Sequence, residues 1–359
     1  MPRIALTLGD VAGIGPEVVV RAWSEARLHE WCQPIVVGHP EVVRRAVQLV
    51  GAPMQVHAVA RLDEGTPDPS NLLCWNPAED EAADVRPGRN DARAGRAAFE
   101  YLRAAATAAR EGQIDALTTA PLSKAALHLA GLHYPGHTEI LAELCGVREF
   151  AMMLYLSDVA GFGKLRQESS KIEHEFESPE TSITTPHALG VTHVTLHTSL
   201  RSVPELLTTP GILEKITLLD RFLKNLGTAM PRIGVCALNP HAGEDGLFGD
   251  EESRLIAPAV ASAAQRGILA TGPLPADALI QRACRGEFDG VVAMYHDQGH
   301  IPLKLVGNGG AVNVTLGLPI VRTSPSHGTA FDIAWQGRAS GRGMVEAVRV
   351  AARLTRSVP

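Results

Sequence analysis

The sequence lacks the marks of several protein classes. Its five cysteines are scattered and include no C-x-x-C pair, which fits neither a disulfide framework nor a thiolate zinc site. Aromatic residues make up 4% and the net charge is -6, so a nucleic acid would find neither stacking platforms nor a basic surface. No apolar run could span a bilayer, and Gly9 comes too soon for a signal peptide. We expect a cytoplasmic protein with no nucleic-acid or membrane partner.

The common nucleotide-binding motifs are also missing. No G-x-x-x-x-G-K-[ST] sequence occurs. Gly13 and Gly15 follow an apolar run and open a helical segment, but the third glycine of a Rossmann fingerprint is absent. Glu17 adds negative charge where a pyrophosphate needs positive potential. A tight strand-to-helix turn beginning a helix at Pro16 explains this stretch without a ligand.

Short β-rich runs alternate with segments of helical length. The strand candidates are "RIALTLGD", "PIVVGHP", "DALTTAP", "FAMMLYLSD", "HVTLHTS", "RIGVCALNP" and "DGVVAMYHD", and residues 91–112 and 251–267 are predicted helices. This pattern predicts an α/β fold with a largely parallel sheet, whose ligands bind at the carboxyl ends of the strands. Residues 60–91 are expected to form a loop, and 161–190 an exposed insertion.

Three histidines follow apolar strand candidates: His197, His241 and His296. Strand ends can bring distant residues together, and three neutral imidazoles form a good site for zinc or a similar divalent ion. Glu244 and Asp297 lie near two of these histidines and could orient them. The alternative is that each histidine is an ordinary hydrogen-bonded loop residue, since the chain contains 14.

Two further stretches are candidates for binding an anion. Residues 304–330 combine the flexible Gly307 and Gly309 with Lys304, Asn313 and Arg322, and glycine loops offer backbone N–H groups to phosphate or carboxylate. The alternative is a glycine hairpin beside solvated bases.

His137 and Thr138 precede a helical segment. Thr138 suits an N-cap, which leaves His137 without a structural explanation.

The motifs in this order resemble one family, the 4-hydroxythreonine-4-phosphate dehydrogenases of vitamin B6 biosynthesis. The resemblance runs through "GDVAGIGPE", "TTAPLSK", "PGHTE", "LNPHAGE", "GPLPAD", "MYHDQG", "VNVTLGLP" and "RTSPSHGTA". It implies two α/β/α domains around a cleft, similar to isocitrate and isopropylmalate dehydrogenases. The expected domains are 1–128 with 306–359, and 129–305.

The resemblance also implies an activity. The family oxidises the secondary alcohol of 4-phosphooxy-L-threonine with NAD, and loss of carbon dioxide gives 3-amino-2-oxopropyl phosphate on the way to pyridoxal 5'-phosphate. By resemblance, His197, His241 and His296 match the ligands of a divalent ion, zinc, magnesium or cobalt. They are drawn from both subunits of a homodimer with its active site at the interface.

Further roles come from the same resemblance. His137, Thr138, Asn313 and Arg322 match substrate-contacting positions, and Lys304 matches a substrate-binding and catalytic position. The cofactor is expected near the glycine loops at Gly13 and Gly15 and at Gly307 and Gly309, and NADP is an alternative to NAD.

The sequence departs from the family at Ser326, where aspartate is usual, and in the length of 161–190. The loss of that aspartate suggests a second interpretation, a paralogue that oxidises D-erythronate or D-threonate 4-phosphate. A third is a non-redox metal enzyme or a phosphate-ligand binding protein on the same scaffold, because a fold does not fix an activity.

Overall fold

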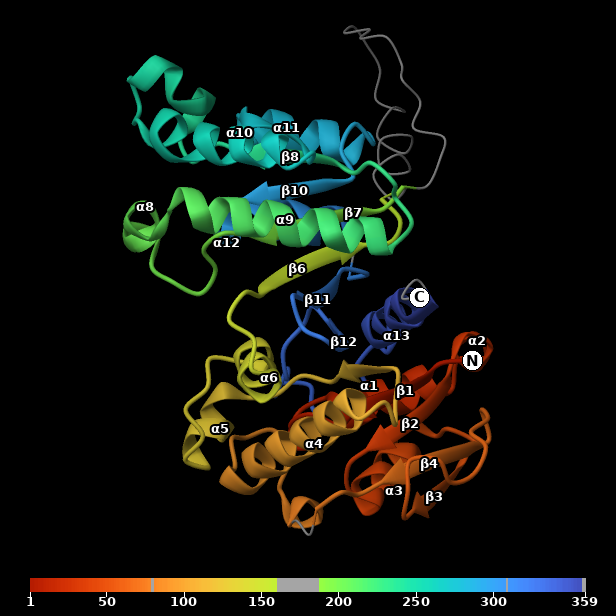
Figure 1. The fold of residues 1–359 in the computed structure, drawn as a ribbon. Coiled ribbons are helices and arrows are strands. Elements are labelled where there is room, and N and C mark those ends of the chain that lie inside the picture. The colour runs from red at the N-terminus through yellow and green to blue at the C-terminus, as the bar shows by residue number, and fades with distance from the viewer. Residues whose placement is uncertain (79–80, 160–186, 308, 357–359) are drawn as a thin grey trace, which may run out of the picture. The chain divides into compact units, whose positions relative to one another are not determined.

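The computed structural model describes residues 1–78, 81–159, 187–307 and 309–356 (Figure 1). The chain divides into two compact units. Unit 1 comprises Met1–Phe150 with Val312–Pro359, and unit 2 comprises Ala151–Ala311. Both ends of the chain therefore belong to unit 1.

Unit 1 is built on a sheet in the order β3-β4-β2-β1-β5-β12-β11. Its neighbours pair in parallel except β11 and β12. Its elements are β1 (Arg3–Thr7), α1 (Gly15–Trp23), α2 (Ala26–Trp31), β2 (Gln33–Val37), α3 (Pro40–Val50), β3 (Gln55–Val59), β4 (Asn71–Trp75), η1 (Ala82–Asp84), α4 (Ala92–Arg110), β5 (Ala116–Thr119), α5 (Lys124–Leu129), α6 (His137–Cys145), β11 (Val312–Leu316), β12 (Val321–Pro325) and α13 (Arg342–Arg356).

Unit 2 has the strand order β6-β7-β10-β8-β9, parallel except for the pair β6 and β7. Its elements are β6 (Ala151–Leu156), β7 (Leu189–His193), η2 (Leu200–Ser202), α8 (Val203–Leu206), α9 (Thr209–Asn225), β8 (Arg232–Cys236), η3 (Pro240–Gly246), η4 (Glu252–Ile256), α10 (Ala257–Gln265), β9 (Leu269–Leu274), α11 (Ala276–Cys284), β10 (Gly290–Ala293) and α12 (His296–Gly307). Within the described residues, no helix is long and apolar enough to cross a bilayer.

Helices cover both faces of the sheet in unit 2. A side chain at Gly190 would meet Leu219 of α9, whereas the next residue along β7, Val191, lies against Gly299 of α12. Successive strand residues point to opposite faces, so α9 and α12 lie on opposite sides of β7. The mixed α/β fold predicted from the sequence is confirmed.

Polar caps mark where several helices begin. The side chains of Asp91, Ser123 and Thr208 accept hydrogen bonds from the first-turn N–H groups of α4, α5 and α9. These residues satisfy donors that have no partner inside the helix. The predicted helix at 91–112 accordingly appears as α4.

The unit boundaries lie at 150/151 and 311/312, whereas the sequence placed the domain boundaries at 128/129 and 305/306. Residues 129–150 belong to unit 1 because α6 packs against α4. The predicted insertion at 161–190 falls mostly outside the described residues. Its last two positions are the first two of β7.

Several local predictions were wrong. The interval 60–91 contains a strand, β4, which is buried between β2 and β3. The strand predicted around "HVTLHTS" lies earlier, as β7, because Leu189–His193 are the residues buried in the sheet. The strands β9, β11 and β12 were not predicted, because glycine, proline, asparagine or arginine interrupts each apolar pattern.

The core of unit 1 provides a stability prediction. Leu6 of β1 is fully buried, and Leu6→Ala should lower the free energy of unfolding by about 2–5 kcal/mol because it leaves a cavity. All four tryptophans lie in unit 1, so their fluorescence during urea unfolding reports on this unit. Leu129→Ala on α5, where the side chain is 62% exposed, is the control. Equal losses in the two variants would contradict the assigned core.

Candidate functional site

Two of the predicted metal ligands lie together in unit 2. His296 is the first residue of α12, and His197 lies in the loop after β7. Their ring centroids are 6.2 Å apart, and both residues line a hollow of about 540 Å³. The carboxyl ends of the parallel strands β7 and β10 lie side by side, which explains why residues that follow them meet.

Two further imidazoles, those of His300 and His193, lie behind His296. The ring of His300 stacks on that of His296 with centroids 3.8 Å apart, and Nδ1 of His300 lies 3.1 Å from Nε2 of His193. Burial lowers the pKa of His193 to about 3 and that of His300 to about 4. Both rings are therefore neutral at neutral pH, and one donates a hydrogen bond to the other.

Carboxylates orient two of the candidate ligands. Glu244 Oε2 lies 2.8 Å from Nδ1 of His241, and Asp297 Oδ1 lies 2.6 Å from Nδ1 of His296. A carboxylate accepts the Nδ1 proton and leaves the lone pair of Nε2 available, which is the usual arrangement behind a metal-ligating histidine. This donor set fits a divalent cation.

His241 lies on an unusual turn. His241, Ala242, Glu244 and Asp245 all have positive φ between 46° and 56°, and Gly243 between them has φ 83°. Such left-handed conformations are costly for residues other than glycine. The side chain of His241 is 72% exposed. Among the described residues of one chain, no group of three or more His, Cys, Asp or Glu side chains is placed to hold a metal ion.

Lys304 lies on the same helix as His296. The two residues are eight positions apart on α12, with His300 midway, so all three project from one face. The charge of Lys304 contributes to lowering the pKa of His300. Lys304 is exposed.

Unit 1 contains a buried positive charge. The side chain of Arg322 on β12 is 3% exposed. Its Nη2 and Nε donate to Thr119 Oγ1 at 2.7 and 3.2 Å, and Nη1 donates to Thr315 Oγ1 at 3.1 Å. Burial lowers its pKa to about 9, so the guanidinium stays charged at neutral pH. No carboxylate in the described part of the chain forms an ion pair with it. The charge of Glu139 raises this pKa but does not offset the effect of burial, so the buried guanidinium suits an anionic ligand.

Two more predicted substrate contacts begin α6. His137 is its first residue and Thr138 its second, so Thr138 is not the N-cap: Gly136 takes that position, with an extended backbone that leads into the helix. Burial, and then the charge of Arg322, lower the pKa of His137 well below its usual value. A neutral imidazole at this helix start can donate or accept one hydrogen bond without adding charge.

Asn313 is also placed in unit 1, on β11. Its Nδ2 donates to Pro325 O at 3.3 Å, and its Oδ1 is buried without a hydrogen-bond partner. A buried acceptor of this kind is costly unless a ligand or water donates to it.

The glycine turn at the start of α1 is explained by packing. A side chain at Gly13 would meet Thr329 O at 2.8 Å, and one at Gly15 would meet Leu8 O at 2.1 Å. These glycines allow close approach of protein backbone, which accounts for the turn without a ligand. The expected cofactor role of Gly13 and Gly15 stays a prediction. Gly309 has φ 80° and faces open space, whereas a side chain at Gly307 would meet Leu156.

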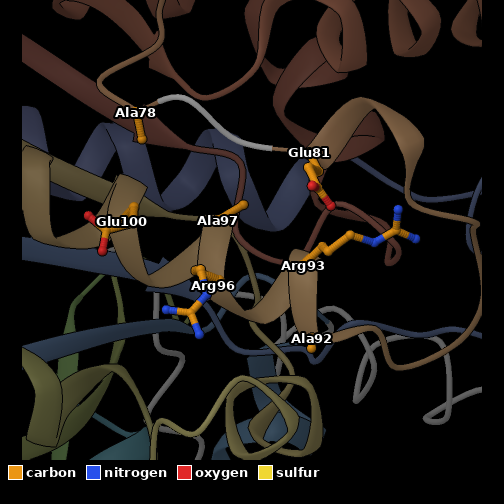
Figure 2. Close-up of a pocket in the computed structure, with 7 residues that line it drawn as sticks. All are labelled: Ala78, Glu81, Ala92, Arg93, Arg96, Ala97 and Glu100. Atoms are coloured by element: carbon orange, nitrogen blue, oxygen red, sulfur yellow. The ribbon is translucent and has the colours of Figure 1, made fainter.

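A further hollow of about 500 Å³ lies along α4 in unit 1 (Figure 2). Three of its four charged groups already have protein partners: Arg93 pairs with Asp91, Glu100 with Arg103, and Arg96 donates to Ala130 O. No residue predicted from the sequence to bind metal or substrate lines it.

Known proteins match this chain along almost its whole length. The model of the family described as pyridoxal phosphate biosynthetic protein PdxA matches residues 30–351. The chain belongs to this family. A 4-hydroxythreonine-4-phosphate dehydrogenase of Geobacter metallireducens is 43% identical over 99% of this chain and 96% of its own. A D-threonate 4-phosphate dehydrogenase of Salmonella typhimurium is 41% identical over 98% of each chain.

A solved structure agrees with the sequence relatives. The crystal structure of 4-hydroxythreonine-4-phosphate dehydrogenase from Klebsiella pneumoniae has a TM-score of 0.83 and 41% identity, and the alignment covers 99% of this chain and 100% of that one. The family resemblance read from the motifs is confirmed.

Sequence reasoning missed several residues that shape these sites. Thr119 and Thr315 hold Arg322, and His193 lies under His300. The spacing of His296, His300 and Lys304 by four residues was a usable signal for one helix face. It was obscured because Pro302 lies inside α12.

The support of Arg322 can be tested by stability. Thr119→Val removes the oxygen that accepts two guanidinium hydrogen bonds and should lower the free energy of unfolding by about 1–3 kcal/mol, because buried N–H groups lose their acceptor. The measurement is urea unfolding followed by tryptophan fluorescence. Thr107→Val on the exposed side of α4 should change stability by less than about 0.5 kcal/mol. A loss of unfolding free energy no larger than that of the control would show that these hydrogen bonds do not stabilise the fold.

Proposed function

We propose that the protein is an NAD-dependent, divalent-metal-dependent dehydrogenase that oxidises 4-phosphooxy-L-threonine with decarboxylation to 3-amino-2-oxopropyl phosphate. The observation that carries this proposal is the buried guanidinium of Arg322, whose hydrogen-bond partners among the described residues are hydroxyl groups, in a chain of the PdxA family. The relatives named above act on phosphorylated hydroxy acids, which are anions of the size and charge that such a group recognises.

In this proposal, the residues of unit 1 bind and orient the substrate. Arg322 neutralises an anionic group, and Thr119 and Thr315 fix the plane of its guanidinium. His137 and Thr138 at the start of α6 add polar groups where the helix dipole favours negative charge. The unpaired Asn313 Oδ1 accepts a hydrogen bond from a donor on the ligand.

In unit 2, His197, His241 and His296 hold the cation, with Glu244 and Asp297 fixing two of the rings. When bound, a divalent ion lowers the pKa of a nearby hydroxyl and stabilises negative charge that develops on it. Three imidazoles suit zinc or a similar ion such as cobalt better than magnesium, which prefers oxygen ligands.

The electron acceptor is proposed to be NAD, with NADP as the alternative, because the named relatives are dehydrogenases. When bound, NAD would supply the acceptor for the hydride that leaves the carbinol carbon. Lys304, exposed on the His296 face of α12, holds a substrate anion or moves a proton, and the two roles rank equally. All five cysteines are free, which is consistent with a reducing cytoplasm.

A second candidate substrate is D-threonate or D-erythronate 4-phosphate. The Salmonella typhimurium relative is named for the threonate compound and is nearly as similar as the Geobacter metallireducens protein. Beside its carboxylate, 4-phosphooxy-L-threonine carries an amino group, whereas the two sugar-acid phosphates carry a hydroxyl group. Ser326 stands where the family usually has an aspartate.

Purified protein supplied with NAD and Mn²⁺, Mg²⁺ or Zn²⁺ should form NADH from 4-phosphooxy-L-threonine with kcat/KM at least tenfold above that for either sugar-acid phosphate. The measurement is absorbance of NADH in parallel reactions. The opposite ranking would assign the second substrate. Absence of NADH in every reaction would refute both assignments.

The proposed dimer is supported by apolar side chains beside each candidate ligand. Leu200 follows His197 and is 70% exposed, and Leu247 follows His241 and is 73% exposed. On α12, Ile301 and Leu305 lie one turn apart and are 54% and 73% exposed. Exposed large apolar residues of this kind favour a partner surface. A second copy that buries them would bring its own His241 toward the pair His197 and His296.

This arrangement predicts complementation between inactive variants. His241→Ala and His296→Ala should each abolish turnover while leaving thermal unfolding within about 3 °C of wild type, because exposed ligands add little packing. Mixed and allowed to exchange subunits, the two variants should regain about a quarter of wild-type turnover, since half the dimers then contain one intact site. Activity that stays absent in verified mixed dimers would place all three ligands of one ion on a single chain.

A further inference from the structure

The side chain of Gln298 joins the two segments that carry His241 and His296. Gln298 lies in the first turn of α12, two residues after His296. Its Oε1 accepts from Met294 N at 2.7 Å, and its Nε2 donates to Ala237 O at 2.7 Å. Met294 directly follows β10 and Ala237 directly follows β8. One side-chain amide therefore bridges the ends of two neighbouring parallel strands.

A primary amide suits both contacts, because its oxygen accepts and its nitrogen donates. The backbone of Met294 offers a donor and that of Ala237 an acceptor, so the bridging group must accept at one end and donate at the other. A carboxylate of the same shape accepts at both ends and would oppose the carbonyl oxygen of Ala237. A thioether of similar length makes neither bond well.

The segment held by Gln298 leads straight into the left-handed turn of His241. On its other side, Glu252 Oε1 accepts from Leu238 N and Asn239 N, each at 2.8 Å. Glu252 is 5% exposed, so its carboxylate is a fixed anchor. The three residues before the turn are thus held by side chains from α12 and from η4. Gln298 lies on the helix that begins with His296, whereas Glu252 lies on η4.

We propose that Gln298 is a positioning residue that sets the His241 turn relative to the His296 helix and so preorganises both imidazoles for the cation. This inference rests on the proposed function, because it assumes that these histidines bind a metal ion. It holds whether the two imidazoles face one ion or the two ions of a dimer, since the bridge lies within one chain. Gln298 itself contacts neither ion nor substrate.

The test uses Co²⁺ binding to the metal-free full-length protein. Gln298→Met removes both hydrogen bonds without adding charge, and Gln281→Met at an exposed position of α11 is the matched control. Calorimetry gives the affinity, and visible absorption of bound Co²⁺ reports the geometry of its ligands. Thermal unfolding in EDTA shows that the apoprotein remains folded.

Gln298→Met should bind Co²⁺ about 10–100-fold more weakly than wild type with an altered absorption band, as expected when support of a ligand is lost. The control should match wild type in both. A merely structural role would lower the unfolding temperature without changing the affinity or the band, and that result would overturn the inference.

Two further variants keep the result decisive. If Gln298→Met does not fold, Gln298→Glu replaces it. This variant keeps the acceptor for Met294 N and loses only the donor to Ala237 O. Co²⁺ affinity and absorption equal to those of wild type in Gln298→Glu would then overturn the inference. Absence of Co²⁺ binding by the wild-type protein, or unchanged binding by His296→Ala, would instead refute the proposed metal site. The two failures are therefore distinguishable.

Discussion

Parallel strand pairing is the constraint on which both candidate sites depend. In each unit the carboxyl ends of neighbouring parallel strands reach the same edge, and the chain leaves that edge through loops or helix starts. Thr119 ends β5, His296 begins the helix after β10, and His241 lies on the turn after β8. The backbone hydrogen bonds of the sheet thus fix where the polar side chains begin, and short local contacts decide where they point.

The two units place polar groups in different ways. Unit 1 buries a guanidinium on a strand and satisfies it with two hydroxyl groups, so its position is set by the sheet register. Unit 2 places imidazoles beyond the strand ends, where their positions depend on side chains such as Glu252 and Gln298. A buried charge on a strand has little freedom to move. A loop imidazole needs several supporting contacts to be equally well placed.

Much of the fold could be predicted from the sequence, because buried parallel strands read as short apolar runs between helical segments. The strand β4 and the hairpin of β11 and β12 could not, since the apolar run of β4 covers only residues 72–75 between polar flanks, and Asn313 and Arg322 interrupt the apolar pattern of the hairpin. Their burial is made possible by partners far away in sequence, such as Thr119 for Arg322. Local pattern carries no information about such partners.

Local sequence pattern was limited in the same way for the candidate metal and substrate sites. Strand-end placement singled out His197, His241 and His296, and the structure brings His197 and His296 together in one chain. It also shows the supports that no local signal revealed, because they involve backbone atoms. The contact of Gln298 with Ala237 O joins residues 61 positions apart through a carbonyl oxygen that every residue possesses.

The left-handed turn at 241–245 has a consequence for affinity. Each residue other than glycine in that conformation costs about 1–2 kcal/mol relative to its ordinary state, so the turn competes with relaxed forms of the same loop. If the proposed ion binds His241 only in molecules with the turn wound, its apparent dissociation constant is the intrinsic one divided by their fraction. Occupancy of His241 and winding of this loop would then be thermodynamically coupled, and each would favour the other.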